Sequence, residues 1–152
     1  MKEFTSIESI LDFAINNEQN AVDFYTQLAG SSKNEEMTKV FTQFAKEEMG
    51  HKTRLTRIKN EGAFNLKNEK TVLDLKMADY LVDVEPKPNM SYEEALIVAM
   101  KREKSAFKLY SHLSEKAPTA ELQKIFEGLA IEESKHKLRF ELEYDDYVLR
   151  EN

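Results

Sequence analysis

The chain of 152 residues contains no cysteine and no tryptophan, and it has only four glycines and three prolines. The absence of cysteine excludes disulfides, thiolate metal sites and iron–sulfur clusters, and it is typical of a reducing cytoplasm. So few glycines and prolines, together with 41% hydrophobic and 33% charged residues, favour a helical globular protein over a sheet protein or a disordered chain. The length suits one hydrophobic core, so we expect residues 1–152 to form a single domain.

Long apolar runs and an excess of positive charge are also missing. No apolar run approaches the ~20 residues of a membrane-spanning helix, and the first residues lack the apolar core of a signal peptide. The formal net charge of −6 argues against a nucleic acid or an anionic membrane as partner, because both require a basic face. We therefore expect a cytoplasmic protein that binds neither nucleic acid nor membrane.

Four segments carry apolar residues at helical spacing. They cover residues 6–28, 33–60, 91–115 and 118–149. Short connections predict two antiparallel hairpins, and residues 61–90 form a long crossover in which we expect a short helix. The expected capping boxes are Thr5 with Glu8, Ser32 with Glu35 and Ser91 with Glu94, and the expected C-terminal glycines are Gly30 and Gly62. This pattern predicts an all-α four-helix bundle of the ferritin-like arrangement.

The two predicted hairpins repeat each other. Residues 6–55 align with residues 91–140 without a gap, and 17 of the 50 aligned positions are identical. The repeat includes "EEMGH" at Glu47–His51 and "EESKH" at Glu132–His136. Self-similarity over this length indicates an internal duplication.

Each predicted helix carries one acid on its apolar face, because ~100° per residue places that acid in line with neighbouring apolar residues. In two helices a histidine follows the acid by three residues, one turn further on the same face. Glu47 and Glu132 are rotated by ~100° and point outward. The inward acids are Glu18, Glu48, Glu103 and Glu133, and the histidines are His51 and His136.

Four carboxylates gathered in a bundle core lose their hydration and repel one another, so either a cation binds there or most of them are protonated. Two divalent ions supply +4 against the −4 of the four glutamates. One glutamate from each of two helices and Glu-x-x-His from the other two is a known dinuclear metal pattern. Oxygen and imidazole ligands without thiolate suit iron or manganese, and zinc fits without redox chemistry. We predict two metal ions per chain, with iron favoured over manganese or zinc and all six residues as ligands.

Tyr25 and Tyr110 each follow a predicted ligand glutamate by seven residues. A tyrosine on an apolar stripe is most often a core residue whose hydroxyl finds a partner. The alternative is that each hydroxyl donates a hydrogen bond to a ligand carboxylate. The sequence leaves both readings open.

The segments "NNEQNAVDFY", "FAKEEMGH", "AMKREKSAFKLY" and "LAIEESKH" resemble the rubrerythrin and wider ferritin-like di-iron family. Members of that family reduce hydrogen peroxide or dioxygen with ferrous iron, or oxidise Fe(II) for storage. The resemblance implies the following roles: Glu48 and Glu133 bridge two metals, Glu18 and Glu103 are terminal ligands, and His51 and His136 bind one metal each.

The sequence departs from typical rubrerythrins in two places. It has no rubredoxin domain with its four cysteines, so electrons must come from an external donor such as a rubredoxin-like protein. Ala106, mirrored by Ala21, stands where rubrerythrins usually carry an additional glutamate.

The favoured function is an oxidoreductase that reduces hydrogen peroxide or dioxygen in oxidative stress. We expect the four inward glutamates, Tyr25 and Tyr110 to be its catalytic residues. The alternatives are Fe(II) oxidation in iron handling and a non-enzymatic metal-binding protein. The sequence leaves the oligomeric state open, a homodimer included.

Overall fold

The computed structural model describes residues 7–32, 34–62, 90–117 and 119–151. Within these ranges the chain forms four helices and no strand. They are α1 (Ile7–Ser31), α2 (Glu35–Glu61), α4 (Tyr92–Lys116) and α5 (Ala120–Glu151). The all-α prediction is therefore confirmed, while the short helix expected within residues 61–90 falls almost entirely outside the described residues. Searched over the same ranges, the helices include none with the length and apolar character of a membrane span.

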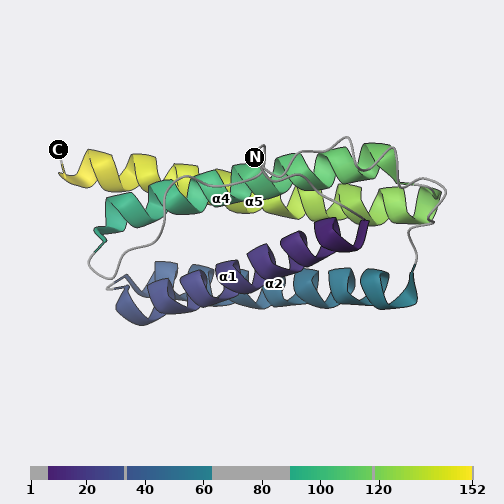
Figure 1. The fold of residues 1–152 in the computed structure, drawn as a ribbon. Coiled ribbons are helices and arrows are strands. Elements are labelled where there is room, and N and C mark those ends of the chain that lie inside the picture. The colour runs from purple at the N-terminus through teal and green to yellow at the C-terminus, as the bar shows by residue number, and fades with distance from the viewer. Residues whose placement is uncertain (1–6, 33, 63–89, 118, 152) are drawn as a thin grey trace. The chain divides into compact units, whose positions relative to one another are not determined.

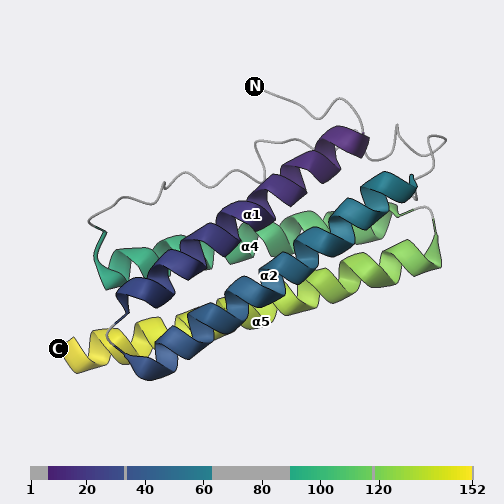
Figure 2. The ribbon, with the colours of Figure 1, turned by 90° about the horizontal axis from the view of Figure 1, so that it is seen from below.

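The chain divides into two compact units, and each unit contains one helical hairpin. In the first, α1 and α2 run side by side in opposite directions; in the second, α4 and α5 do the same (Figures 1 and 2). Both predicted hairpins are thus present. That the two units form one domain stays a prediction.

The ends of α2 show how local chemistry fixes the hairpin connection. Asn34, and not the predicted Ser32, is the N-cap, because its side-chain oxygen accepts hydrogen bonds from the backbone N–H groups of Glu36 and Met37. The Ser32 hydroxyl accepts instead from the backbone N–H of Asn34, at 3.3 Å. At the other end Gly62 has φ 61°, a left-handed conformation that favours glycine, as predicted.

The other helix ends correct one prediction and confirm another. α1 continues through Gly30 to Ser31, so Gly30 does not end the helix as expected. A glycine inside a helix costs only about 1 kcal/mol, which the surrounding turns of α1 tolerate. The capping box of Ser91 and Glu94 is present in both directions, at 3.1 and 3.2 Å. The box expected at Thr5 and Glu8 lies outside the described residues, because Thr5 is not among them.

Aromatic and aliphatic side chains fill the interior of the first hairpin. Tyr25 is fully buried on α1 and meets Phe44 of α2 edge to face, with ring centroids 6.3 Å apart. A part-buried polar contact also joins the same two helices: the Lys52 Nζ donates to Gln19 Oε1 at 2.7 Å. This contact lies one residue from Glu18 and one from His51, so it fixes the two helices at the level of the buried acids.

Hydrogen bonds to a buried carboxylate join the two helices of the second hairpin. Tyr92, the first residue of α4, donates its hydroxyl to Oε2 of Glu143 on α5 at 2.9 Å, and Arg150 Nη2 reaches the same oxygen at 3.3 Å. Burial first, and then the hydrogen bond to Glu143, raise the pKa of Tyr92 above its usual value. The start of α4 is thereby held against the end of α5.

The two hairpins bury the same positions of the sequence repeat. Six pairs of identical residues at equivalent positions are buried in both copies, so these positions of the two hairpins pack alike as well as matching in sequence. These pairs are Leu11/Leu96, Ala14/Ala99, Tyr25/Tyr110, Leu28/Leu113, Phe41/Phe126 and Ala45/Ala130.

Candidate metal centre

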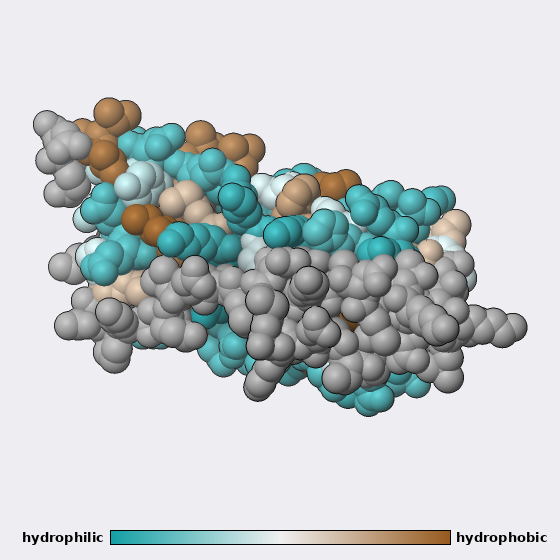
Figure 3. All heavy atoms as spheres, turned by 45° about the horizontal axis from the view of Figure 1, so that its top comes forward, coloured by the Kyte–Doolittle hydropathy of each residue, from teal (hydrophilic) through white to brown (hydrophobic). Residues whose placement is uncertain are grey.

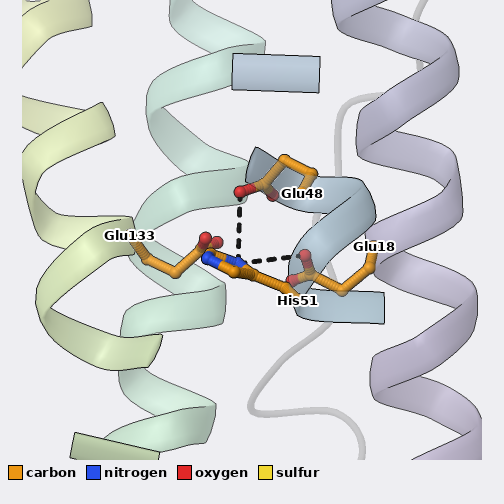
Figure 4. Close-up of side chains that lie close together, drawn as sticks. All are labelled: Glu18, Glu48, His51 and Glu133. Carbon is orange, nitrogen blue, oxygen red and sulfur yellow. Dashed lines mark ion pairs between the residues drawn. The ribbon is translucent and has the colours of Figure 1, made fainter. Parts of the chain in front are cut away.

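The first hairpin gathers two carboxylates and an imidazole in its interior. Glu18 comes from α1, and Glu48 and His51 come from successive turns of α2. His51 Nδ1 lies 3.2 Å from Glu18 Oε2 and 3.4 Å from Glu48 Oε1 (Figure 4). All three side chains are only 1–2% exposed. One ligand atom of each lies within 4.8 Å of the others, close enough to bind one ion together.

The second hairpin repeats this cluster. Glu103 comes from α4, and Glu133 and His136 come from α5. His136 Nδ1 lies 3.6 Å from Glu103 Oε1 and 4.0 Å from Glu133 Oε1. These side chains are also 1–2% exposed, and one ligand atom of each again lies within 4.8 Å of the others. The structure therefore brings together, within each hairpin, the three residues that the sequence predicted there.

The neighbouring acids show that the helix phase was predicted correctly. Glu48 is 1% exposed, whereas Glu47, one residue earlier, is only partly buried. Glu133 and Glu132 differ in the same way. A step of ~100° around the helix is what separates an inward acid from an outward one.

The donor atoms of both clusters fit a hard or borderline divalent cation. Carboxylate oxygens and imidazole nitrogen without thiolate suit iron and manganese. In each histidine it is Nδ1 that faces the carboxylates, so Nδ1 is the nitrogen placed to bind a metal together with them. When ionised beside a neutral imidazole, the two buried carboxylates of each cluster carry a net negative charge, and a bound cation would compensate their lost hydration.

Tyr25 and Tyr110 are fully buried, at 0% and 1% exposure. Tyr25 packs on Phe24 and Phe44, and Tyr110 stacks on Phe126 with ring centroids 6.4 Å apart. These ring contacts show that both side chains are core residues. A hydrogen bond from either hydroxyl to a ligand carboxylate stays a prediction.

Glu143 is a buried acid that our sequence reasoning missed. It is 5% exposed and follows His136 by seven residues, two turns further on the buried side of α5. That spacing, with the buried Phe140 between them, was the available signal. Its partners are the Tyr92 hydroxyl and the Arg150 guanidinium, so Glu143 holds the second hairpin together.

The arrangement of helices defines the class of protein. The structure has the fold of a ferritin-like diiron-carboxylate protein from Thermotoga maritima, with a TM-score of 0.79 and 21% sequence identity. The match covers 97% of this chain and 99% of the Thermotoga chain. The fold is therefore the ferritin-like four-helix fold predicted from the sequence.

The family follows from the sequence itself. The rubrerythrin family model matches residues 9–144, which include both buried clusters, and the chain belongs to the rubrerythrin family. No curated protein sequence matches the chain.

Proposed function

We propose that the chain binds two metal ions in one dinuclear site and acts as an oxidoreductase on hydrogen peroxide or dioxygen. The observation that carries the proposal is the repeated cluster. Each hairpin buries two glutamates and one histidine at the same sequence spacing, and in both hairpins the histidine Nδ1 faces the two carboxylates. Membership of the rubrerythrin family supports joining the two clusters into one site. The proposed ligands are Glu18, Glu48 and His51 from the first hairpin and Glu103, Glu133 and His136 from the second.

Charge balance favours two divalent ions over one. The four glutamates carry −4 when ionised, and two ions carrying +4 would leave the site neutral with both imidazoles uncharged. One ion would leave two buried negative charges uncompensated, which is costly in an interior of low polarity. All six proposed donor side chains are buried, and this burial would keep bulk water away from the proposed site.

Iron is the favoured metal, and manganese or zinc are the alternatives. Bound as a ferrous pair, iron would supply the two electrons that, with two protons, reduce hydrogen peroxide to two molecules of water. The protein would position the donors, because the three donors of each hairpin lie on three turns of its two helices. Those helices also carry fully buried core residues, Phe41 and Leu55 in the first hairpin and Phe126 and Phe140 in the second. Since the sequence has no cysteine, we propose that a separate protein, such as a rubredoxin-like carrier, returns the electrons.

Fe(II) oxidation for iron handling is the second candidate. Ala106 favours it, because a small apolar residue stands on α4 where a typical rubrerythrin carries a further acid. In the structure Ala106 is partly buried, and its repeat equivalent Ala21 is 6% exposed. The proposed ligand set is then limited to four glutamates and two histidines.

Anaerobic loading with Fe(II), followed by oxidant, tests the proposal. We expect about two irons per chain, a ferric absorption that develops on mixing with hydrogen peroxide, and its loss when a rubredoxin-type donor and its reductase are added. Accumulation of ferric mineral, with many Fe(II) consumed per chain, would support iron handling instead. An absorption spectrum that changes with neither hydrogen peroxide nor dioxygen would exclude the redox function.

A further inference from the structure

The two hairpins repeat their buried donors but differ in the polar residues close to them. In the view of Figure 3 most of the described surface is hydrophilic, and its hydrophobic areas are small and separate. At the offset of the sequence repeat, several polar positions near the proposed ligands pair residues of unlike chemistry. These pairs are Gln19/Lys104, Asp23/Lys108 and Thr56/Glu141, while Lys52/Lys137 is the same residue in both hairpins.

In the first hairpin these residues join the two helices at the level of the buried acids. Lys52 Nζ on α2 donates to Gln19 Oε1 on α1 at 2.7 Å, and Gln19 Nε2 donates to Asp23 Oδ1 at 2.9 Å. Gln19 is thus held from both sides, an arrangement that we call the Lys52–Gln19 clamp. Gln19 directly follows Glu18, and Lys52 directly follows His51. The clamp therefore fixes the helical turns that carry Glu18 and His51, whose side chains point toward each other in Figure 4.

The chemistry of the second hairpin does not allow the same clamp. Lys104 stands at the position equivalent to Gln19, and a lysine ammonium donates hydrogen bonds but accepts none. Lys137 therefore finds no acceptor in Lys104. Its Nζ donates instead to Glu141 Oε1 at 2.7 Å, four residues further along the same helix. The lysine that joins α1 to α2 in the first hairpin is thus paired within α5 in the second.

The distances within the two donor clusters differ in the same sense. His51 Nδ1 lies 3.2 and 3.4 Å from the nearer oxygens of its two carboxylates, whereas His136 Nδ1 lies 3.6 and 4.0 Å from the equivalent ones. Donors that are already held together lose less conformational freedom when an ion binds, so they bind it more tightly. Residues that hold metal ligands from outside typically change metal affinity by about 10–100-fold when they are removed.

We propose that the Lys52–Gln19 clamp positions Glu18 and His51 for metal, so that the donors of the first hairpin take up the first ion and those of the second hairpin take up the next. Lys52 and Gln19 are positioning residues, since they act through the ligands beside them. This order of loading rests on the proposed metal site, whose donors alone are of the same kind in both hairpins and give no order.

Nuclear magnetic resonance of the histidine side chains during a titration with Zn(II) tests the order of loading. The chain has three histidines, and His112 is not a proposed ligand, so its signals serve as an internal reference. We expect the Nδ1 signal of His51 to shift with the first equivalent of Zn(II) and that of His136 to shift with the second. Signals that shift together, or a shift of His136 first, would overturn the order. Zn(II) that moves neither signal would contradict the proposed metal site itself.

Lys52→Met and Lys59→Met form a matched pair of variants for calorimetric titration with Zn(II). Lys59 also joins α2 to α1, through Asp12 Oδ1 at 2.6 Å, but it lies ~12 Å along the helix from His51. We expect Lys52→Met to weaken the first binding step by about 10-fold. Lys52→Arg should restore it, because arginine keeps a donor, and Lys59→Met should leave it unchanged. Equal losses in the two methionine variants, or no loss in Lys52→Met, would overturn the positioning role.

Moving the clamp to the second hairpin gives the converse test. The changes Lys104→Gln, Lys108→Asp and Glu141→Thr place the residues of the first hairpin around Lys137. When they are combined with Lys52→Met, we expect the His136 signal to shift with the first equivalent of Zn(II). A His51 signal that still shifts first would show that the clamp does not determine the order of loading.

Discussion

Replacing Glu48 by glutamine separates metal binding from packing. Glu48 is 1% exposed and lies 3.4 Å from His51 Nδ1. Glutamine keeps the shape of the side chain but removes its charge, so the core stays filled while a proposed bridging ligand is lost. We expect the metal-free variant to be at least as stable as the metal-free wild type, because one buried negative charge has been removed.

The size of the effect follows from binding linkage. An ion present at a hundred times its dissociation constant stabilises the folded state by about 2.7 kcal/mol, so two ions contribute about 5 kcal/mol. For a chain of this length each kcal/mol raises Tm by about 2–4 °C, which gives an increase of about 10–20 °C for the wild type. Glu48→Gln should lose at least half of this increase, and its metal content should fall from two ions to one or none per chain.

Glu47→Gln is the matched control. Glu47 precedes Glu48 in the same helix but is only partly buried, so the same chemical change should leave two ions and the full increase in Tm. Thermal unfolding with and without Mn(II), together with elemental analysis, measures both quantities. Equal losses in Glu47→Gln and Glu48→Gln would refute the reasoning, and the pair Glu132→Gln and Glu133→Gln repeats the comparison in the second hairpin.

Three further outcomes follow from the structure. Tyr92→Phe removes the 2.9 Å hydrogen bond to the buried Glu143 and should lower the free energy of unfolding by about 1–3 kcal/mol in thermal unfolding. Tyr144→Phe loses a 3.3 Å hydrogen bond at the surface and should change the free energy of unfolding little. Equal effects of the two substitutions would contradict the stabilising role of the Tyr92–Glu143 hydrogen bond. Gly62→Ala should cost about 1 kcal/mol, seen as a fall in Tm of about 2–4 °C, because φ of 61° is unfavourable for alanine although no atom lies within 4 Å of the added carbon; an unchanged Tm would show that this cap contributes nothing. In stopped-flow mixing of the Fe(II)-loaded protein, hydrogen peroxide should react faster than dioxygen at equal concentration, and the reverse order would favour iron handling.

Helical periodicity was enough to predict the fold and the inward acids. The apolar stripes determined the phase of each helix, and the phase placed Glu48 inside and Glu47 at the surface. The repeat strengthened this prediction, since the same residues recur with the same burial in the second hairpin.

The helix ends were harder to predict, because several neighbouring residues offer similar chemistry. Ser32 and Asn34 both have side-chain oxygens that can cap a helix, and only the backbone geometry selects Asn34. Gly30 satisfied the pattern of a C-terminal glycine, yet the helix continues past it.

The exposed fraction of residues at the margin of a helix's apolar face could not be predicted from the sequence either. Phe107 follows Glu103 by four residues and is apolar, yet it is 41% exposed, because a position ~40° from that acid lies at the margin of the buried face.

We propose that the two buried clusters hold two metal ions side by side in one site. An electron paramagnetic resonance spectrum of the protein loaded with two Mn(II) per chain tests it most directly. We expect the broad multi-line spectrum of two magnetically interacting Mn(II) ions, and its loss in Glu48→Gln but not in Glu47→Gln. The six-line spectrum of isolated Mn(II), or saturation at one ion per chain, would contradict it.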